Sequence, residues 1–190
     1  MTLFTMTQRA MTLALFGLLA TPAARAGDET VSVKQLELEK EGTQLIDQLE
    51  DVARDIRYNS DRLTSFAHDR QISKWTHFHH LQQIKELVND GLRPAIRRLV
   101  EIREELPSWH QHAIDQMLDS ARLLAADTNS AILRKSNADV PPAFDTEYKE
   151  LIATIHGHAE SLVETSDAAG KYASAHRQAV LAGLKVPTKH

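Results

Sequence analysis

Residues 38–66 read LEKEGTQLIDQLEDVARDIRYNSDRLTSF, and this stretch decides the fold class. Its apolar residues recur at alternating steps of three and four, which is the spacing of one face of an α-helix and is similar to a coiled-coil heptad. No proline interrupts the pattern, and strand-like alternation is absent. The stretch therefore predicts one long helix over residues 32–69. Its seam comprises Leu38, Gly42, Leu45, Leu49, Val52, Ile56, Asn59, Leu63 and Phe66.

A second helical pattern extends from Lys74 to Leu106, with Ser73 placed to cap its first turn. Gly91 and Pro94 lie inside this pattern. Proline has no N–H to donate, and its ring clashes with the preceding turn of a helix. We therefore expect a kink at residues 91–94, and a full break into two helices is the alternative.

Two more helical patterns follow. The third begins at Ser108, which forms a capping-box pattern with Gln111, and it ends near Lys135. The fourth begins at Asp145, after the proline-containing loop of residues 136–144, and runs to about residue 180.

Four amphipathic helices joined by short connections favour antiparallel neighbours. The predicted fold is therefore all-α, an antiparallel up-down-up-down four-helix bundle with long first and fourth helices. We expect it to occupy residues 27–186, followed by a polar tail at residues 187–190.

The first 26 residues have the pattern of a cleaved signal peptide. Arg9 precedes an apolar run at residues 11–20, and Ala24 and Ala26 form a small-x-small cleavage pattern. This run is too short to span a membrane as a helix, so we expect no membrane span after cleavage. Cleavage removes two arginines and no acidic residue, which changes the net charge from −4 to −6. The predicted localisation is periplasmic or secreted.

The composition excludes several classes of protein. The chain has 190 residues, ten histidines and no cysteine, so it has neither disulfides nor a cysteine-ligated metal nor a thiol nucleophile. A net charge of −4 argues against a broad surface for nucleic acid. No glycine-rich phosphate loop or nucleophile elbow is present. We therefore expect no enzymatic activity and no cofactor.

The histidines are the feature that points to chemistry. His77 and His80 are three residues apart on one helix, so both imidazoles can reach one ion, and the bundle topology brings His156 to the same end. These three residues are the candidate ligands of a zinc, copper or nickel site. The favoured interpretation is that most histidines are solvated at helix ends and that one or two are hydrogen-bonded in the core, and a pH-responsive role is a further alternative. The topology predicts His68, His77, His79, His80, His156 and His158 at one end, and His110, His112 and His176 at the other.

Two other groups of residues favour structural roles. Arg97 and Glu101 have helical pair spacing within a stretch rich in arginine and glutamate, which favours a solvated, salt-bridged face over an anion site. Trp75 and Trp109 each follow a helix start, and we expect both to plug the ends of the bundle.

Residues 106–115, LPSWHQHAID, together with Asn89-Asp90-Gly91 upstream and Tyr148 downstream, carry a resemblance. In this pattern the chain resembles a group of uncharacterised exported bacterial helical proteins over roughly residues 75–180. The resemblance implies a helical exported protein and supplies no activity. The function expected from the sequence is a non-catalytic interaction or structural role in the cell envelope, with a protein partner that the sequence does not identify. Metal binding by histidines is the alternative function, and monomer and homodimer both stay open.

Overall fold

The first long pattern forms α1 (Val33–Phe66) in the computed structural model, which describes residues 33–137 and 140–181. The predicted helix is confirmed, and every seventh residue from Gly42 to Leu63 is buried as the seam predicts. The other buried row of the helix lies one position later in the sequence than predicted. Ile46, Ala53 and Ser60 are buried, whereas Leu45, Val52 and Asn59 are partly exposed. The reason is that α1 contacts other helices on two sides, so its buried stripe is centred between them.

The second pattern forms a continuous path of four short elements: α2 (Lys74–Glu86), the π-helical turn η1 (Leu87–Leu92), α3 (Arg93–Ile102) and the 3-10 turn η2 (Arg103–Glu105). The side chain of Ser73 caps α2 by accepting from the N–H of Thr76 at 3.2 Å, as predicted. The irregularity expected at residues 91–94 is a π-helical turn, in which the N–H of Arg93 donates to the carbonyl of Val88. This wider turn accommodates Pro94 without the full break that was the alternative.

Gly91 allows η1 to pack closely against α1. A Cβ built at Gly91 would lie 2.8 Å and 2.9 Å from the two Cγ atoms of Val52. A β-branched valine has few rotamers, so it cannot turn away from such a contact. The glycine is therefore explained by packing, although it lowers the intrinsic helix propensity of the segment.

We expect Gly91→Ala to destabilise the protein by up to about 2 kcal/mol, because an overpacking cost of about 1–3 kcal/mol outweighs the roughly 1 kcal/mol that alanine gains in a helix. The matched control is Gly157→Ala, where no atom lies within 4 Å of the added Cβ, and there we expect stabilisation by about 1 kcal/mol. Urea unfolding followed by circular dichroism measures both. Val52→Ala should relieve the clash in the Gly91→Ala background. Equal stabilities of the two glycine variants would contradict the argument.

The last two long helices are α4 (Ser108–Asn137) and α5 (Thr146–Leu181), joined in part by the short 3-10 turn η3 (Pro142–Phe144). The predicted capping box at Ser108 is wrong. Ser108 is the first residue of α4 and not the cap that precedes it. The side chain of Gln111 instead donates to the carbonyl of Leu106 at 2.9 Å. Asp145 caps α5, since its carboxylate accepts from the N–H of Tyr148 at 3.1 Å.

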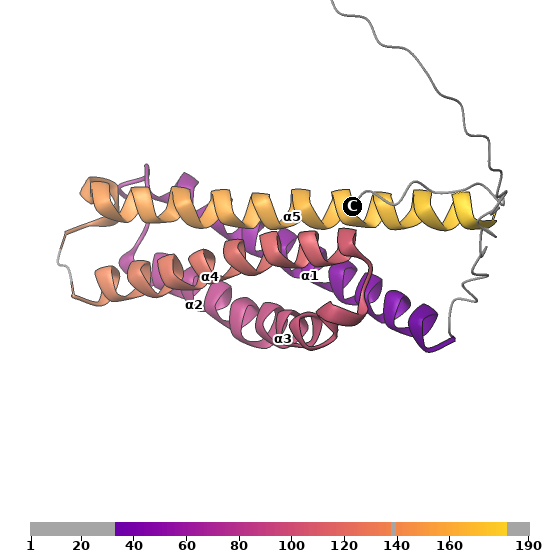
Figure 1. The fold of residues 1–190 in the computed structure, drawn as a ribbon. Helices are drawn as coiled ribbons and strands as arrows, with labels where there is room; N and C mark the ends of the chain where they lie inside the picture. Colours follow the sequence, from indigo (N-terminus) through magenta and orange to yellow (C-terminus); the bar gives the residue numbers. More distant parts are fainter. Residues whose placement is uncertain (1–32, 138–139, 182–190) are drawn as a thin grey trace, which may run out of the picture. The chain divides into compact units, whose positions relative to one another are not determined.

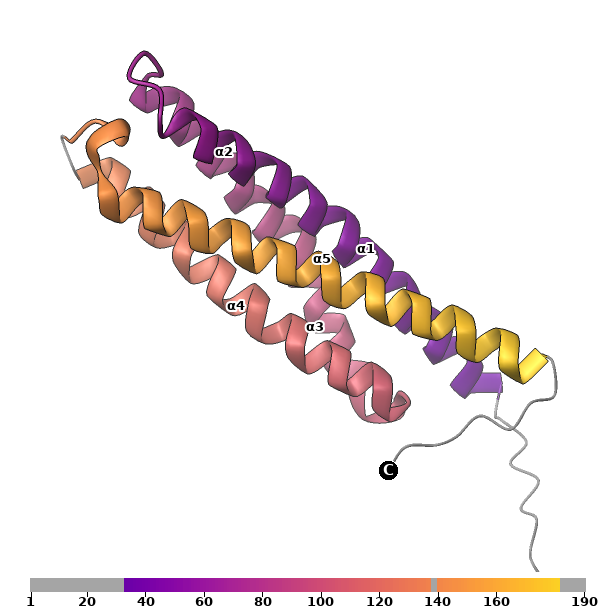
Figure 2. The same ribbon diagram turned by 90° about the horizontal axis from the view of Figure 1, so that it is seen from above.

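The described residues contain helices, turns and bends and no strand, which confirms the all-α class. α5 lies between α1 and α4 and packs against both, while the path from α2 to α3 contacts α1 and α4 (Figures 1 and 2). The core between them is mainly leucine, isoleucine and alanine. Within the described part of the chain, no helix combines the length and apolarity that crossing a membrane requires. The predicted signal peptide at residues 1–26 and polar tail at residues 187–190 lie outside the described residues.

Candidate functional site

The three predicted metal ligands have separate partners. His77 Nδ1 lies 3.0 Å from the hydroxyl of Tyr148, and His80 Nδ1 lies 3.0 Å from the side-chain oxygen of Asn59. His156 Nδ1 lies 3.3 Å from the hydroxyl of Ser60. The structure therefore does not bring these three imidazoles together around one point. Among the residues that the structure describes, no three His, Cys, Asp or Glu side chains are grouped so that they can hold a metal ion.

The reason for this separation is the direction in which each helix presents its histidines. His77 is fully buried and faces α5, whereas His80 is half-buried and faces α1. His156 also lies near Asp61 of α1, but His158 lies 3.3 Å from Asp127 of α4. Residues two apart on a helix point in different directions, which is why His156 and His158 face different helices.

A buried polar network surrounds His77. Lys135 and Asp145 are both fully buried, and the lysine Nζ lies 2.8 Å from the carboxylate. The same Nζ lies 4.5 Å from the centre of the Tyr148 ring, and the hydroxyl of this tyrosine contacts His77. The network thus joins α2, α4 and the start of α5, although the Nε2 atom of His77 has no hydrogen-bond partner. Sequence reasoning missed it because no local pattern links residues so far apart.

Burial and neighbouring charge shift the pKa values in this network. Burial and the nearby Lys135 lower the pKa of His77 to about 4. Burial alone would raise the pKa of Asp145, but hydrogen bonds from Lys135 and Arg134 lower it to about 2. Burial raises the pKa of Tyr148 well above its usual range. At neutral pH the network therefore consists of two neutral rings and the Asp145 carboxylate, which pairs with both Lys135 and Arg134.

An aromatic cluster surrounds His110 at the start of α4. The Trp109 and His110 rings stack with centroids 3.5 Å apart, and Tyr172 of α5 lies 5.0 Å from Trp109. His110 is buried, and neither of its ring nitrogens has a hydrogen-bond partner. Burial, with a smaller contribution from His176, lowers the pKa of His110 to about 4. The cluster therefore holds a neutral imidazole in an apolar setting.

The two tryptophans differ in their environment. Trp109 packs against the core, as expected. Trp75 does not plug an end of the fold, because 79% of it is exposed and its ring contacts only the edge of Phe78 among the described aromatic rings. The prediction for Trp75 is therefore wrong, and the reason is that Trp75 lies at the outer face of the first turn of α2, whose buried face is occupied by His77 and Leu81.

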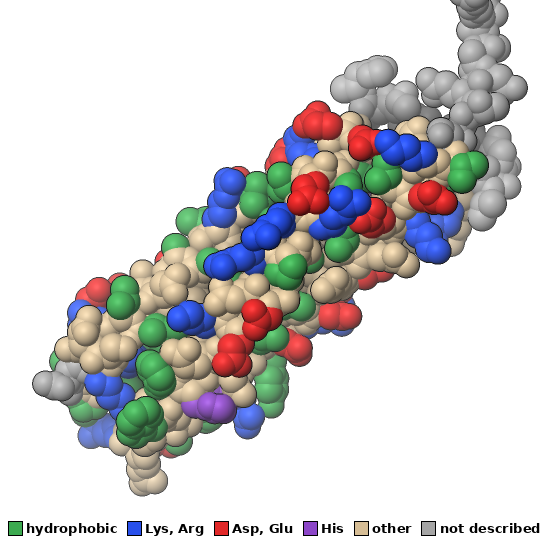
Figure 3. Space-filling view, turned by 90° about the horizontal axis from the view of Figure 1, so that it is seen from below, with side chains coloured by type: hydrophobic (Ala, Val, Ile, Leu, Met, Phe, Trp, Pro, Cys, Tyr) green, Lys and Arg blue, Asp and Glu red, His purple; other side chains and the backbone are tan. Residues whose placement is uncertain are grey.

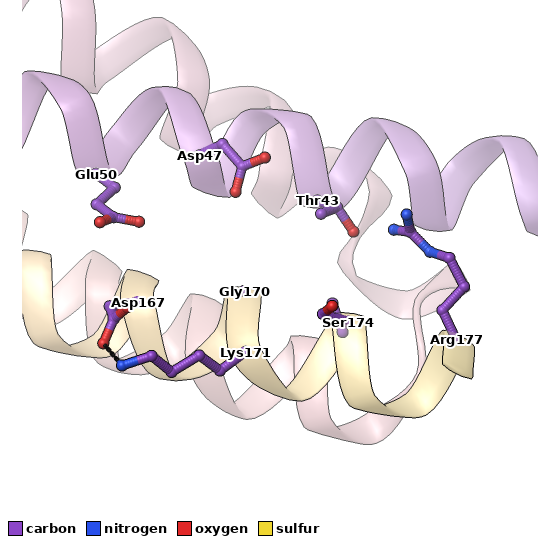
Figure 4. A pocket seen from close by; sticks show the side chains of 9 residues that line it. Thr43, Asp47, Glu50, Asp167, Gly170, Lys171, Ser174 and Arg177 are labelled. Atoms are coloured by element: carbon purple, nitrogen blue, oxygen red, sulfur yellow. Dashed lines mark hydrogen bonds and ion pairs between the residues drawn. The ribbon is translucent and has the colours of Figure 1, made fainter. Parts of the chain in front are cut away.

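A polar cleft of about 400 Å³ lies between α1 and α5 (Figure 4). Carboxylates enter it from both helices, with Asp47 and Glu50 on α1 and Asp167 on α5. Asp167 already pairs with Lys171 at 2.6 Å, and Glu50 pairs with Arg54. These ion pairs neutralise much of the acidic charge, so the cleft is a solvated polar seam.

An apolar groove of about 360 Å³ lies between α3, η1 and α4. Ala95, Leu99 and Ile102 occupy the face of α3 that packs against the core. A second apolar row of α3, Ile96 and Val100, lines the groove. Val100 in this row is 44% exposed. The apolar lining residues are Val88, Leu92, Ile96, Val100, Leu118, Ala121 and Ala125. This is an apolar hollow that is accessible from outside, whereas the networks around His77 and His110 are buried.

Arginines border the groove. Arg93 and Arg97 line it from α3, and Arg122 lines it from α4. In Figure 3, where α3 is nearest the viewer, basic side chains lie beside hydrophobic ones. The predicted pair of Arg97 with Glu101 is wrong, because Glu101 pairs with Arg98, which also binds Glu41.

The guanidinium groups of Arg93 and Arg97 are therefore available to a ligand. Both residues are exposed, and neither forms an ion pair with any residue in the described ranges. Arg122 lies 3.8 Å from Asp119 in an exposed pair, which is worth little in water. The groove thus combines an apolar floor with uncompensated positive charge. We take it as the candidate functional site.

Part of this site was readable in the sequence. Val88, Leu92 and Ile96 lie within the second helical pattern, and Arg93 and Arg97 belong to the stretch rich in arginine and glutamate. No local pattern predicts that α3 and α4 leave a hollow between them, because that depends on how closely two distant segments approach. Comparisons with protein-family models, with curated proteins and with solved structures found no match.

Proposed function

We propose that this is an exported, non-catalytic binding protein of the cell envelope, and that it holds an apolar ligand in the groove between α3 and α4. The observation that carries the proposal is the accessible groove of about 360 Å³ lined by seven apolar side chains. Small-molecule sites typically measure about 300–1,000 Å³ and are mostly apolar with a few polar groups. The size of the groove favours a small ligand over a partner helix.

The arrangement of the titratable groups supports binding over catalysis. His77, Lys135, Asp145 and Tyr148 are buried and bind one another, so a substrate has no direct access to them. The groove itself is bordered by arginines, which bind and orient anions but rarely transfer protons near neutral pH. A binding role uses these features as they stand.

We further propose that the helices form an antiparallel up-down-up-down four-helix bundle, in which α2, η1 and α3 together form the second helix. Short connections between successive helices support this arrangement. It is also supported by the packing of α5 against α1 and α4 and of α2 and α3 against the same two helices. Export to the periplasm or the exterior is supported by the signal-peptide pattern of residues 1–26.

The binding role is tested with N-phenyl-1-naphthylamine, an uncharged dye that fluoresces in apolar sites. We expect saturable binding to the wild-type protein. Ala125→Trp places an indole in the groove and should weaken binding at least tenfold, because Ala125 is partly buried and lines the groove. The matched control is Ala126→Trp, one residue along α4 at an exposed position, where binding should be unchanged.

Circular dichroism and unfolding midpoints must show that both variants fold. Binding that is absent in the wild type, or that falls equally in the two variants, would overturn the proposal.

A further inference from the structure

Resting on this proposed function, we infer that the ligand is a long-chain carboxylate, whose apolar chain lies in the groove and whose anionic head group binds Arg93 and Arg97. Three observations carry the inference: the volume of the groove, its apolar lining and the unpaired arginines at its border.

The volume sets the chain length. A water molecule occupies about 30 Å³ in the liquid. If a methylene group takes a similar volume, a groove of about 360 Å³ holds about a dozen carbons. Side chains from both walls, such as Ile96 of α3 and Leu118 of α4, bound this space. A shorter chain would leave part of the apolar surface in contact with water, and a longer one would project from it.

The charges set the head group. Arg93 and Arg97 are one helical turn apart on α3, so one carboxylate can be reached by both guanidinium groups. Arginine matches the planar carboxylate with two parallel N–H donors. The one acidic residue that lines the groove, Glu101, is already paired with Arg98 at 3.2 Å. The positive border stands out because the whole chain carries a net charge of −4.

A cationic amphiphile would meet the opposite situation. Its head group would face Arg93, Arg97 and Arg122, whereas Glu101, the acidic residue that lines the groove, is already paired with Arg98. Like charges in a partly apolar site repel more strongly than in water. The groove should therefore discriminate between two amphiphiles of equal chain length by the sign of the head group.

The test is displacement of N-phenyl-1-naphthylamine from the full chain by octanoate, decanoate, dodecanoate and tetradecanoate, all below their micellar concentrations. Each buried methylene is worth about 0.8 kcal/mol, which is about a fourfold gain in affinity. We expect Kd to fall by about this factor per carbon up to about dodecanoate, and then to level off. Dodecylamine should bind at least tenfold more weakly than dodecanoate.

A double variant isolates the head-group contact. Arg93→Gln with Arg97→Gln should bind the uncharged dye like the wild type but should lose the preference for dodecanoate over dodecylamine. Arg54→Gln with Arg62→Gln makes the same change of charge at two exposed positions on α1 and should keep the preference.

The outcomes separate this inference from the proposed function. If affinity rises with chain length while dodecylamine binds as tightly as dodecanoate, the apolar groove stands and the anionic ligand is wrong. If the two double variants lose the preference equally, long-range charge and not the α3 arginines is responsible, and the inference is again wrong. If Ala125→Trp leaves dodecanoate binding unchanged, the groove is not the site and both proposals fall.

Discussion

Between pH 6.5 and pH 4 the protein is expected to lose on the order of 6 kcal/mol of stability through two buried histidines. The pKa of His77 and the pKa of His110 are each lowered from 6.5 to about 4, chiefly by burial. The unfolded chain binds these protons near pH 6.5, whereas the folded chain binds them only near pH 4. Stability is therefore complete above pH 6.5 and falls as the pH drops toward 4, by about 3 kcal/mol per histidine. Urea unfolding at intervals between pH 7.5 and pH 4 measures this loss.

Two substitutions separate the contributions of these histidines. His110→Leu removes two buried nitrogens without partners, so we expect it to raise stability at pH 7.5 by about 1–3 kcal/mol and to reduce the loss at pH 4 by about half. His77→Leu leaves the Tyr148 hydroxyl without its imidazole partner and should lower stability at pH 7.5. An acid dependence that is the same in wild type and His110→Leu would contradict the assignment.

Loss of the Asp145 carboxylate is expected to destabilise the protein by about 3–5 kcal/mol, because it leaves the Lys135 ammonium buried without a counter-ion. Asp145 also caps α5, so an alanine substitution would mix two effects. Asp145→Ser keeps a side-chain oxygen that can cap the helix, and it therefore isolates the loss of the ion pair. Denaturant unfolding at pH 7.5 measures the change.

The control restores neutrality to the interior. Lys135→Met added to Asp145→Ser removes the orphaned charge and keeps a side chain of similar length. Replacing a buried ion pair by apolar groups is often close to neutral, so the double variant should recover most of the lost stability. If it is no more stable than Asp145→Ser alone, the buried charge is not the cause.

The helices could be predicted because their signals are local. The spacing of apolar residues located α1, α4 and α5, and the caps at Ser73 and Asp145 marked two helix starts. The π-helical turn before Pro94 was predicted only as an irregularity, because its form depends on how closely Gly91 approaches Val52. The capping box at Ser108 failed although the local pattern matched, because the side-chain amide of Gln111 donates to the carbonyl of Leu106 and does not accept from the backbone of Ser108.

The candidate sites depended on the directions in which side chains point, and local sequence patterns do not determine these directions. His77 and His80 share a stretch of helix, yet one faces Tyr148 and the other Asn59, so three candidate ligands do not form one set. The pairing of Glu101 with Arg98, which leaves Arg97 unpaired, likewise required the side chains of two helices to be placed. Equal spacing along a helix leaves several ion pairs open, and tertiary contacts such as Glu41 with Arg98 select one.

By itself the sequence determined the helical class, the positions of the long helices and the placing of apolar residues along them, because hydrophobic periodicity and capping act within a few residues. Only the tertiary structure decided that Lys135 and Asp145 meet in the interior, that Trp75 is exposed, and that an arginine-bordered groove opens between α3 and α4. Each of these features depends on the distance between segments far apart in the chain, and that distance is set by how the side chains of whole helices fit together.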